Sequence, residues 1–478
     1  MNDALEHSGG YLYEEVVNKI AGMIGQGVLR PGERIPSIRK VSSQLDVSVS
    51  TVLQAYLRLE SRGLIEARPQ SGFYVKFRAE RLPPEPKAST PSTTATAVGV
   101  GELVSKVLEA ARDPEIVPLG AATPSSELLP VRQLNRMMAS IGRRRGAIAI
   151  NYDLPPGNEA LRRQIARRSL DWGCHLSLED IVTTCGGMEA LNLCLRAVAK
   201  PGDTIVIESP TYYGVLQVIE SLGMKALEIA THPREGVDLA ALEYAIKRNK
   251  VSACIMIPNF NNPLGSCMPD KNKKSLVGML ARHRIPLIED DIYGDLYFGS
   301  SRPKTAKAFD REGLVLLCSS FSKNLAPGYR VGWTAPGRFK TQVERLKFMN
   351  TLATATLPQM AIAQFLESGG YDHHLRRLRK SLALQVDRVS LAISRCFPEG
   401  TRVTRPLGGF VLWVELPKSV NSVELHGKAL REKISIVPGA IFSPKQKYQN
   451  FIRLSCGQPW SDRLEQALIT LGRLAGKR

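Results

Sequence analysis

A single lysine, Lys323, stands among small hydroxyl residues in the stretch SSFSKNLAPGYRVGW, which runs from residue 319 to residue 333. An arginine, Arg330, follows it, and no acidic residue lies between the two. A lysine in this setting is either an ordinary surface charge or an amine that can bond covalently to a carbonyl ligand. The stretch alone favours a surface charge, so the choice depends on which residues the fold brings to the same place.

Four short apolar runs, each followed by a polar loop, indicate buried strands of one sheet. They are DTIVIESP from residue 203, ACIMIPNF from residue 253, IPLIEDDIYG from residue 285 and LVLLCSSFS from residue 314. Helical segments alternate with these runs, which is typical of an α/β domain with a mainly parallel sheet covered by helices on both faces. Ligands bind such sheets at the carboxyl ends of the strands, so the polar loops are expected to meet.

Those loops contain, in order, NNPLG, EDDIYGD and SFSKNLAPGYR. Over about residues 115–475 this order resembles the class I aminotransferases of fold type I, which depend on pyridoxal 5'-phosphate. The resemblance implies that Lys323 forms the internal aldimine with this cofactor and can then move the α-proton of an amino compound. It also implies that Ser320, Ser322 and Arg330 bind the phosphate.

The same resemblance assigns further contacts. Asp290 would hold the protonated ring nitrogen of the cofactor, and Asn262 and Tyr293 would hydrogen-bond its ring oxygen. Tyr212 would stack on the ring face, and the backbone amides of Gly187 and Met188, which open a helix, would face the phosphate. Tyr152 matches a tyrosine that reaches the phosphate of the partner subunit, and Arg453 matches the arginine that grips the substrate carboxylate. Asp291, beside Asp290, could be a helix cap and is not assigned to the ring nitrogen.

Each of these residues has a simpler interpretation when it is taken singly. Tyr212 and Tyr293 would be core aromatics, and Arg453 would be a charge at the edge of a strand. Their joint order along the chain favours the site. Gly187 and Met188 replace side chains that often hydrogen-bond the cofactor in the family, which leaves the substrate range and part of the phosphate site open.

The first eighty residues follow a different pattern of helices and a hairpin. An apolar stripe that includes Val16, Val17 and Ile20 predicts a helix that ends at Gly25 or Gly27. SIRKVSSQL, capped by Ser37, predicts a second helix, residues 51–62 predict a third, and GLIEARPQSGFYV predicts a hairpin. This order is typical of a winged helix-turn-helix. The segment from LYEEVV to SGFYV resembles the GntR family over nearly its whole length.

The start of the third helix of such a module enters the major groove, and the wing approaches the minor groove. We therefore predict DNA contacts from Arg39, Ser48, Val49, Ser50, Thr51, Gln54, Gln70, Ser71 and Gly72. Many relatives have an arginine where this chain has Val49, and residues 1–80 carry a net charge of only +1. Affinity from the module alone should be modest, so a dimer or the basic surface of the large domain would have to contribute.

A composition break separates the two parts. RLPPEPKASTPSTTATAV, from residue 81 to residue 98, has almost no large apolar side chains and predicts an extended, flexible linker. GELVSKVLEAARD, from residue 101, predicts a helix. We expect a winged helix-turn-helix at 1–78, a linker at 79–114 and an aminotransferase-like domain at 115–478.

Composition excludes several other classes. The net charge is +19, of which +18 lies beyond residue 80 in clusters that are either solvated helix faces or a surface that follows DNA. Eight cysteines without a C-x-x-C pair argue for reduced thiols and against a metal site. The chain has no signal-peptide pattern and no long apolar run, so we expect a cytoplasmic protein without a membrane partner.

Together the two parts resemble the MocR subfamily of GntR regulators. This predicts a transcription regulator of double-stranded DNA that senses pyridoxal phosphate, an amino-compound effector or both through aldimine exchange at Lys323. The alternative is an active aminotransferase with an accessory or autoregulatory DNA module, because the catalytic residues are retained. The resemblance also implies a homodimer in which each DNA module reaches across to its partner.

Overall fold

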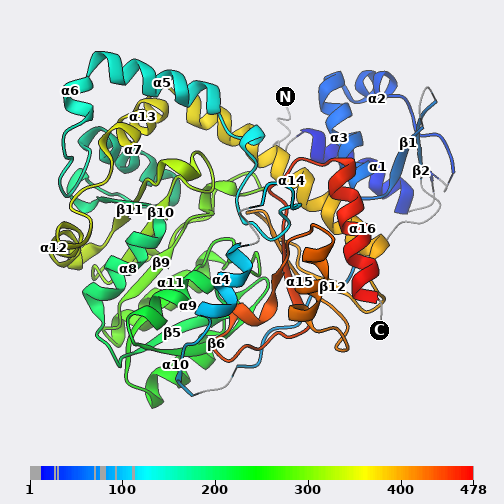
Figure 1. Cartoon of the computed structure of the whole chain (residues 1–478). Helices are drawn as coiled ribbons and strands as arrows, with labels where there is room; N and C mark the ends of the chain where they lie inside the picture. Colours follow the sequence, from blue (N-terminus) through cyan, green and yellow to red (C-terminus); the bar gives the residue numbers. More distant parts are fainter. Residues whose placement is uncertain are drawn as a thin grey trace, which may run out of the picture.

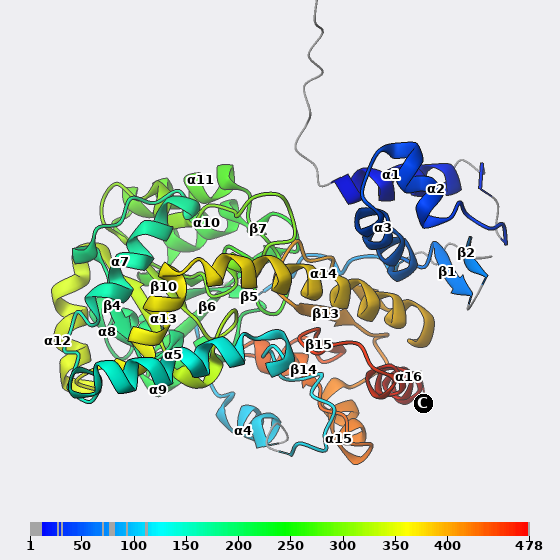
Figure 2. The ribbon, with the colours of Figure 1, turned by 90° about the horizontal axis from the view of Figure 1, so that it is seen from above.

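The computed structural model describes residues 12–25, 28–29, 32–68, 71–75, 82–91, 94–109 and 113–476 (Figure 1). The predictions for Gly27 and Gln70 lie outside these residues. Figures 1 and 2 show a small N-terminal module beside one end of a long helix, with a large α/β domain around the other end.

The N-terminal module contains the three helices and the hairpin that the sequence predicts. They are α1 (Leu12–Gly25), α2 (Ile38–Leu45), α3 (Val49–Ser61), β1 (Ile65–Arg68) and β2 (Gly72–Val75). Ser37 caps α2, as predicted, by accepting a 3.3 Å hydrogen bond from the Lys40 amide. Ser48 caps α3 through the Thr51 amide at 3.1 Å, so α3 begins at Val49, two residues earlier than predicted.

The large domain is built around a nine-stranded sheet with five parallel strands at its centre. The parallel strands are, in spatial order, β6 (Lys225–His232), β5 (Thr204–Ser209), β8 (Val251–Met256), β9 (Leu287–Asp290) and β10 (Val315–Ser320). Antiparallel strands flank them: β3 (Thr96–Ala97) and β7 (Gly236–Val237) beside β6, and β11 (Gly332–Ala335) and β4 (Val182–Thr184) beyond β10. The expected mainly parallel sheet is confirmed.

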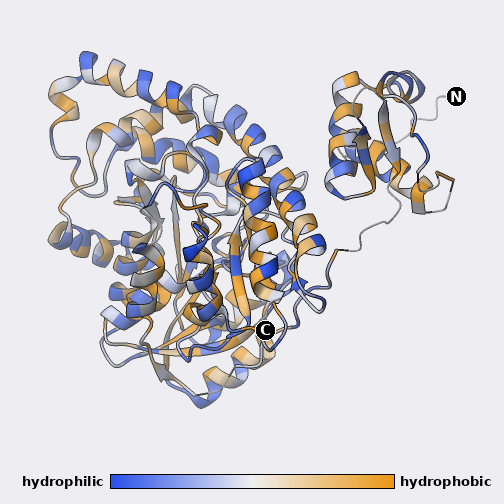
Figure 3. Ribbon diagram, turned by 45° about the vertical axis from the view of Figure 1, so that its right-hand side comes forward, coloured by the Kyte–Doolittle hydropathy of each residue, from blue (hydrophilic) through white to orange (hydrophobic). Residues whose placement is uncertain are grey.

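Alternate residues of each parallel strand pack on opposite faces of this sheet, which is why the runs are apolar throughout. In β5, Ile205 and Ile207 belong to a core with α8 and α9, whereas Val206 packs with α10 and α11 on the other face. Figure 3 shows that the helices around the sheet carry both hydrophilic and hydrophobic residues. The helices of these two cores include α8 (Gly187–Val198), α9 (Tyr213–Ser221), α10 (Leu239–Arg248) and α11 (Asp270–Arg282).

Further helices extend the domain on both sides of this sheet. They are α5 (Val131–Arg144), α6 (Gly146–Ala149), α7 (Glu159–Arg168), α12 (Lys340–Asn350), α13 (Thr356–Glu367) and the 27-residue α14 (Gly370–Cys396). None of the described helices is both long and apolar enough to cross a membrane.

A second, antiparallel sheet lies near the C-terminus and was not predicted from the sequence. Its spatial order is β12 (Arg402–Val403), β13 (Val411–Glu415), β15 (Phe451–Ser455) and β14 (Val437–Pro438). Two helices, α15 (Ser422–Arg431) and α16 (Asp462–Gly476), pack with it.

The predicted linker is extended, as expected, but it is held along the large domain. Ser89 donates a 2.6 Å hydrogen bond to the Ser209 carbonyl, and Glu85 pairs with Arg234 at 2.7 Å. Its second half forms β3, which pairs with β6, and the predicted helix follows as α4 (Gly101–Glu109). The expectation of a free tether is therefore wrong for these described residues, because their polar groups find partners on the domain surface.

Candidate functional site

The polar ends of the parallel strands meet around one cavity of about 270 Å³. Asp290 ends β9, Asn262 follows β8, and Lys323 follows β10. The predicted site residues that line this cavity are Gly187, Met188, Tyr212, Asn262, Asp290, Tyr293, Ser322, Lys323 and Arg330. Residues separated by more than one hundred positions thus converge where the strand order predicts.

Lys323 carries the only side-chain amine that lines this cavity among the described residues. Its Nζ donates a 2.6 Å hydrogen bond to the carbonyl of Ala122. Burial, aided by the positive charges of Arg453 and Arg330, lowers the pKa of Lys323 to about 8. Near neutral pH, a much larger fraction of this amine is therefore neutral and nucleophilic than in a lysine with the usual pKa of 10.5.

Asp290, also buried, lines the same cavity. Burial raises its pKa to about 7; the Ile292 amide, which donates at 3.2 Å, opposes this shift, and the adjacent Asp291 adds to it. A carboxyl group with a pKa near 7 is suited to bind a positively charged partner, because that partner would stabilise the ionised form of the carboxyl group. Asn262 Nδ2 donates to the Tyr293 hydroxyl at 3.4 Å, so these two side chains also lie together.

The opening turn of α8 and the loop after β10 form one end of the cavity. Gly186 caps α8 at φ 85°, and a Cβ there would collide with the guanidinium of Arg330. Arg330 NH1 donates to the Ser322 hydroxyl at 3.2 Å. A Cβ on Gly187 would lie 3.8 Å from Ser320 Oγ, which places that hydroxyl beside the helix. Free amides, hydroxyls and a guanidinium suit a phosphate.

Arg453 lies in β15, between β13 and β14, and is fully buried. The interpretation of a strand-edge charge is therefore wrong. Its NH1 donates to Asn262 Oδ1 at 3.3 Å and its NH2 donates to the Gly120 carbonyl, whereas its Nε has no hydrogen-bond partner. No carboxylate of the described residues forms an ion pair with it, so this buried cation is suited to bind an anion that enters the cavity.

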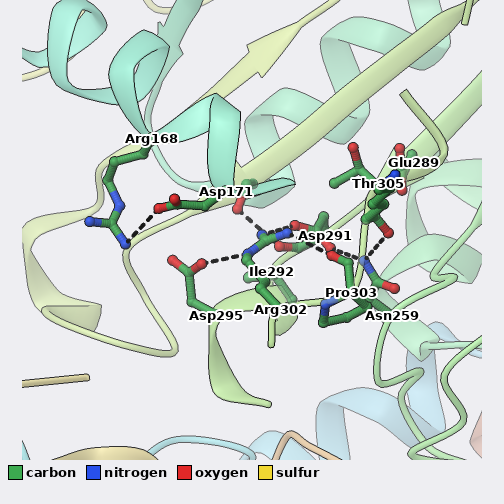
Figure 4. A network of polar contacts seen from close by, with 12 residues as sticks. Arg168, Asp171, Asn259, Glu289, Asp291, Ile292, Asp295, Arg302, Pro303 and Thr305 are labelled. Atoms are coloured by element: carbon green, nitrogen blue, oxygen red, sulfur yellow. Dashed lines mark hydrogen bonds and ion pairs between the residues drawn. The ribbon is translucent and has the colours of Figure 1, made fainter. Parts of the chain in front are cut away.

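Three predicted site residues are not in the cavity lining. Ser320 lies beside Gly187, and Arg453 bonds Asn262, so each adjoins a lining residue. Tyr152 is 77% exposed and lies away from the cavity. Asp291 caps no helix; it accepts a 2.8 Å hydrogen bond from Asn259 and forms an ion pair with Arg302, whose Nε also bonds Asp295 at 2.7 Å (Figure 4). Asp291 thus belongs to a buried network beside the cavity, while Asp290 faces the cavity.

Sequence reasoning missed Glu208, a buried residue near the end of β5. It accepts hydrogen bonds from the Ile257 amide at 2.7 Å and from Asn261 Nδ2 at 2.8 Å, and burial raises its pKa to about 7. Glu208 therefore positions the loop that carries Asn262. An acid inside an otherwise apolar strand was the signal that could have identified it.

Most of the described residues predicted to contact DNA, on α2, α3 and the hairpin, lie at the surface. Arg39, Ser48, Val49, Ser50 and Gly72 are exposed, and Thr51 and Ser71 are half-buried. Ser48 Oγ bonds the hydroxyls of Ser50 and Thr51 at 2.8 and 2.7 Å, so it organises the helix start as well as presenting a hydroxyl. Gln54 differs from the others, because it lines a cavity between α3 and α14.

Both parts of the chain match known families. Residues 12–75 match the family described as bacterial regulatory proteins, gntR family, and residues 131–469 match the family described as aminotransferase class I and II. The chain therefore belongs to the gntR-type regulators with an aminotransferase-like domain, the architecture of the MocR subfamily.

Individual relatives share this architecture over their whole length. The uncharacterized HTH-type transcriptional regulator YdcR of Escherichia coli is 42% identical over 98% of this chain and 99% of its own. A second E. coli protein, the uncharacterized HTH-type transcriptional regulator YjiR, is 39% identical over 96% of this chain and 98% of its own. The solved structure of LysN, the α-aminoadipate aminotransferase of Thermus thermophilus, complexed with N-(5'-phosphopyridoxyl)-L-leucine, is 29% identical and superposes with a TM-score of 0.72, covering 81% of this chain and 95% of LysN.

Proposed function

We propose that this protein is a transcription regulator that holds pyridoxal phosphate on Lys323 and changes its DNA affinity when this cofactor, and then an amino compound, binds there. One observation carries the proposal. Lys323, Asp290 and Arg330 line one cavity, and the buried Arg453 bonds Asn262 of the same lining. The described N-terminal residues of this chain form the three helices and the hairpin of a winged helix-turn-helix. LysN, which shares the fold of the large domain, was solved with a phosphopyridoxyl amino acid.

The residues of the cavity fit this cofactor. Arg330, Ser320, Ser322 and the first amides of α8 would bind its phosphate. Tyr212 would stack on the ring. When bound, pyridoxal phosphate supplies an aldehyde for an amine and a ring that withdraws electrons.

The remaining groups orient the ring and an effector. Asp290 would receive a hydrogen bond from the protonated ring nitrogen, and this contact would favour its ionised form. Asn262 and Tyr293 would bind the ring oxygen. Arg453, a buried cation without a carboxylate partner among the described residues, would bind the carboxylate of an amino-acid effector.

A homodimer belongs to the same proposal. Tyr152 is 77% exposed in the single chain, and an aromatic side chain in that position is available to contact a partner subunit. In this chain α3 contacts α14 of the same chain, and the predicted crossing of the DNA module to its partner stays a prediction.

An active aminotransferase is the second candidate, because a pKa of about 8 also suits Lys323 for proton transfer. One titration separates the two. Candidate amines are added to the cofactor-loaded protein while the cofactor absorption, keto-acid formation and binding to a promoter duplex are followed together. The regulator predicts that amine binding shifts DNA affinity with little turnover. Rapid multiple turnover with unchanged DNA binding would contradict it.

A further inference from the structure

Helix α14 contacts the loop that carries Lys323. His374 Nε2 lies 2.7 Å from the carbonyl of Asn324, the residue that follows Lys323. Burial lowers the pKa of His374 to about 4, so the ring is neutral, and its Nε2–H donates to this carbonyl. The first turns of α14 therefore hold the backbone next to the predicted cofactor lysine.

A second set of contacts joins α14 to the end of β9. The Tyr371 hydroxyl donates to Asp295 at 2.9 Å. Asp295 also accepts from Arg302, which forms an ion pair with Asp291 (Figure 4). Asp291 follows Asp290, the predicted ring-nitrogen acid. Both ion pairs of Arg302 are nearly buried, so a displacement of the β9 end costs contacts that α14 helps to hold.

The distant part of the same helix holds the DNA module. Asp387 forms an ion pair with Arg58 of α3, and Arg58 NH1 donates to the Ala383 carbonyl at 3.3 Å. Thirteen residues separate Asp387 from His374, which is about 20 Å along a continuous helix. Figure 2 shows α14 running from the large domain to α3. One rigid element thus contacts both functional regions.

The contact between α3 and α14 is loosely packed. A cavity of about 250 Å³ lies on one side of it, lined by residues that include Gln54, Leu57 and Lys380. Another, of about 300 Å³, is lined by residues that include Glu60 of α3 and Arg388 of α14. The Arg58–Asp387 ion pair is a direct contact between the two helices in this loosely packed region.

We infer that α14 is the element that couples the cofactor site to the DNA module: a change at Lys323 and Asn324 shifts α14, and the Arg58–Asp387 contact passes this shift to α3. The inference rests on the proposed function and adds to it the residues that transmit the signal. Packed helices commonly move by small rigid shifts between two arrangements. The DNA-reading end of α3 would then be presented differently in the two states.

The test uses the full-length protein and a duplex that the wild type selects from a random-sequence pool. Its affinity is measured without cofactor and with saturating pyridoxal phosphate. The wild type should show a ratio of at least about fivefold between these states. Asp387→Asn, which keeps the side-chain volume and leaves α3 unchanged, should bind the cofactor normally while the ratio falls towards one.

Glu243→Gln is the matched control, since it removes one acid from an exposed ion pair with Lys247 on α10. It should keep the wild-type ratio. A wild-type ratio in Asp387→Asn would overturn the coupling role of α14. Equal affinities of the wild type in both states would overturn the proposed function itself, and the two failures are thereby distinguished.

A second measurement needs no DNA, and it tests the coupling even if the Asp387→Asn variant does not fold. Amide hydrogen exchange of α3 is compared with and without pyridoxal phosphate in the wild type and in His374→Phe, which removes the bond to Asn324 and keeps a ring. The cofactor should change the exchange of α3 in the wild type and not in the variant. The same change in both proteins would refute the coupling through α14.

Discussion

The cofactor cavity and the DNA-reading end of α3 hold their polar side chains in opposite ways. Arg453 is fully buried and is fixed by Asn262 and the Gly120 backbone before any ligand arrives. Ser48 and Ser50 are exposed, and Ser48 bonds the hydroxyls of Ser50 and Thr51 within the same turn. The buried side chains at the cavity are withdrawn from the protein surface and already oriented for a ligand, whereas those of the DNA face are exposed. Single substitutions should therefore have large effects in the cavity and small, additive effects on α3.

The largest effect is expected at Lys323. Lys323→Ala removes the only amine of the described cavity lining, so the absorption band of lysine-bound pyridoxal phosphate should disappear. Lys271→Ala, at an exposed position of α11, is the control and should keep the band. An unchanged spectrum in Lys323→Ala would refute the assigned attachment point.

Asp290→Asn should change the pH dependence of stability in the cofactor-free protein. The folded pKa of about 7 exceeds the usual value of 3.8, so the folded state holds this proton more tightly, and the wild type loses stability as pH rises from about 4 to 7. Asparagine does not titrate. The variant should gain on the order of 2–3 kcal/mol relative to wild type between pH 5 and pH 8.

Thermal unfolding at several pH values measures this difference. The exposed Asp462→Asn is the control and should follow the wild-type pH profile. A stability difference between Asp290→Asn and wild type that stays constant from pH 5 to pH 8 would show that the carboxyl is not perturbed by burial.

Arg453→Lys keeps the charge and removes the second donor for a carboxylate. Loss of one hydrogen bond to a charged group costs about 2 kcal/mol, so an α-amino acid should bind about 30-fold more weakly. The amine that has the same side chain as this amino acid but no carboxylate should lose little affinity for the Arg453→Lys variant. Arg431→Lys, at an exposed position, is the control and should leave the affinities for the amino acid and for the amine unchanged. Equal losses for amino acid and amine would contradict the assignment of Arg453 to the carboxylate.

Val49→Arg should have the smallest effect. Val49 is 53% exposed at the start of α3, so an arginine there can reach a phosphate without repacking. Each added phosphate contact steepens the slope of log affinity against log salt by about 0.9. Fluorescence anisotropy at several salt concentrations measures the slope, and Val49→Gln is the uncharged control. An unaltered slope in Val49→Arg would place this surface away from DNA.

The comparison also explains what the sequence could predict. The strand ends, the order of NNPLG, EDDIYGD and SFSKNLAPGYR, and the winged helix follow from short-range patterns, and the structure confirms these elements. The roles given to single residues stay predictions, although the structure gathers most of them at one cavity.

Other features depend on contacts between distant parts of the chain. Glu208 positions Asn261 across 53 residues, and Arg58 meets Ala383 across 325 residues. Periodicity does not report such pairs. The docked linker was missed for the same reason: its composition predicts an extended chain, while contacts to the buried Ser209 carbonyl and to the Arg234 side chain decide that it is held.

The central claim is that the amine site and the DNA site share one coupling free energy. Linkage requires the effect to be reciprocal, so a duplex must change the amine affinity by the same factor by which the amine changes the duplex affinity. The direct measurement is the amine concentration that half-shifts the cofactor absorption, with and without saturating duplex. The account predicts two concentrations whose ratio equals the shift in DNA affinity. Identical concentrations in the two titrations would contradict it.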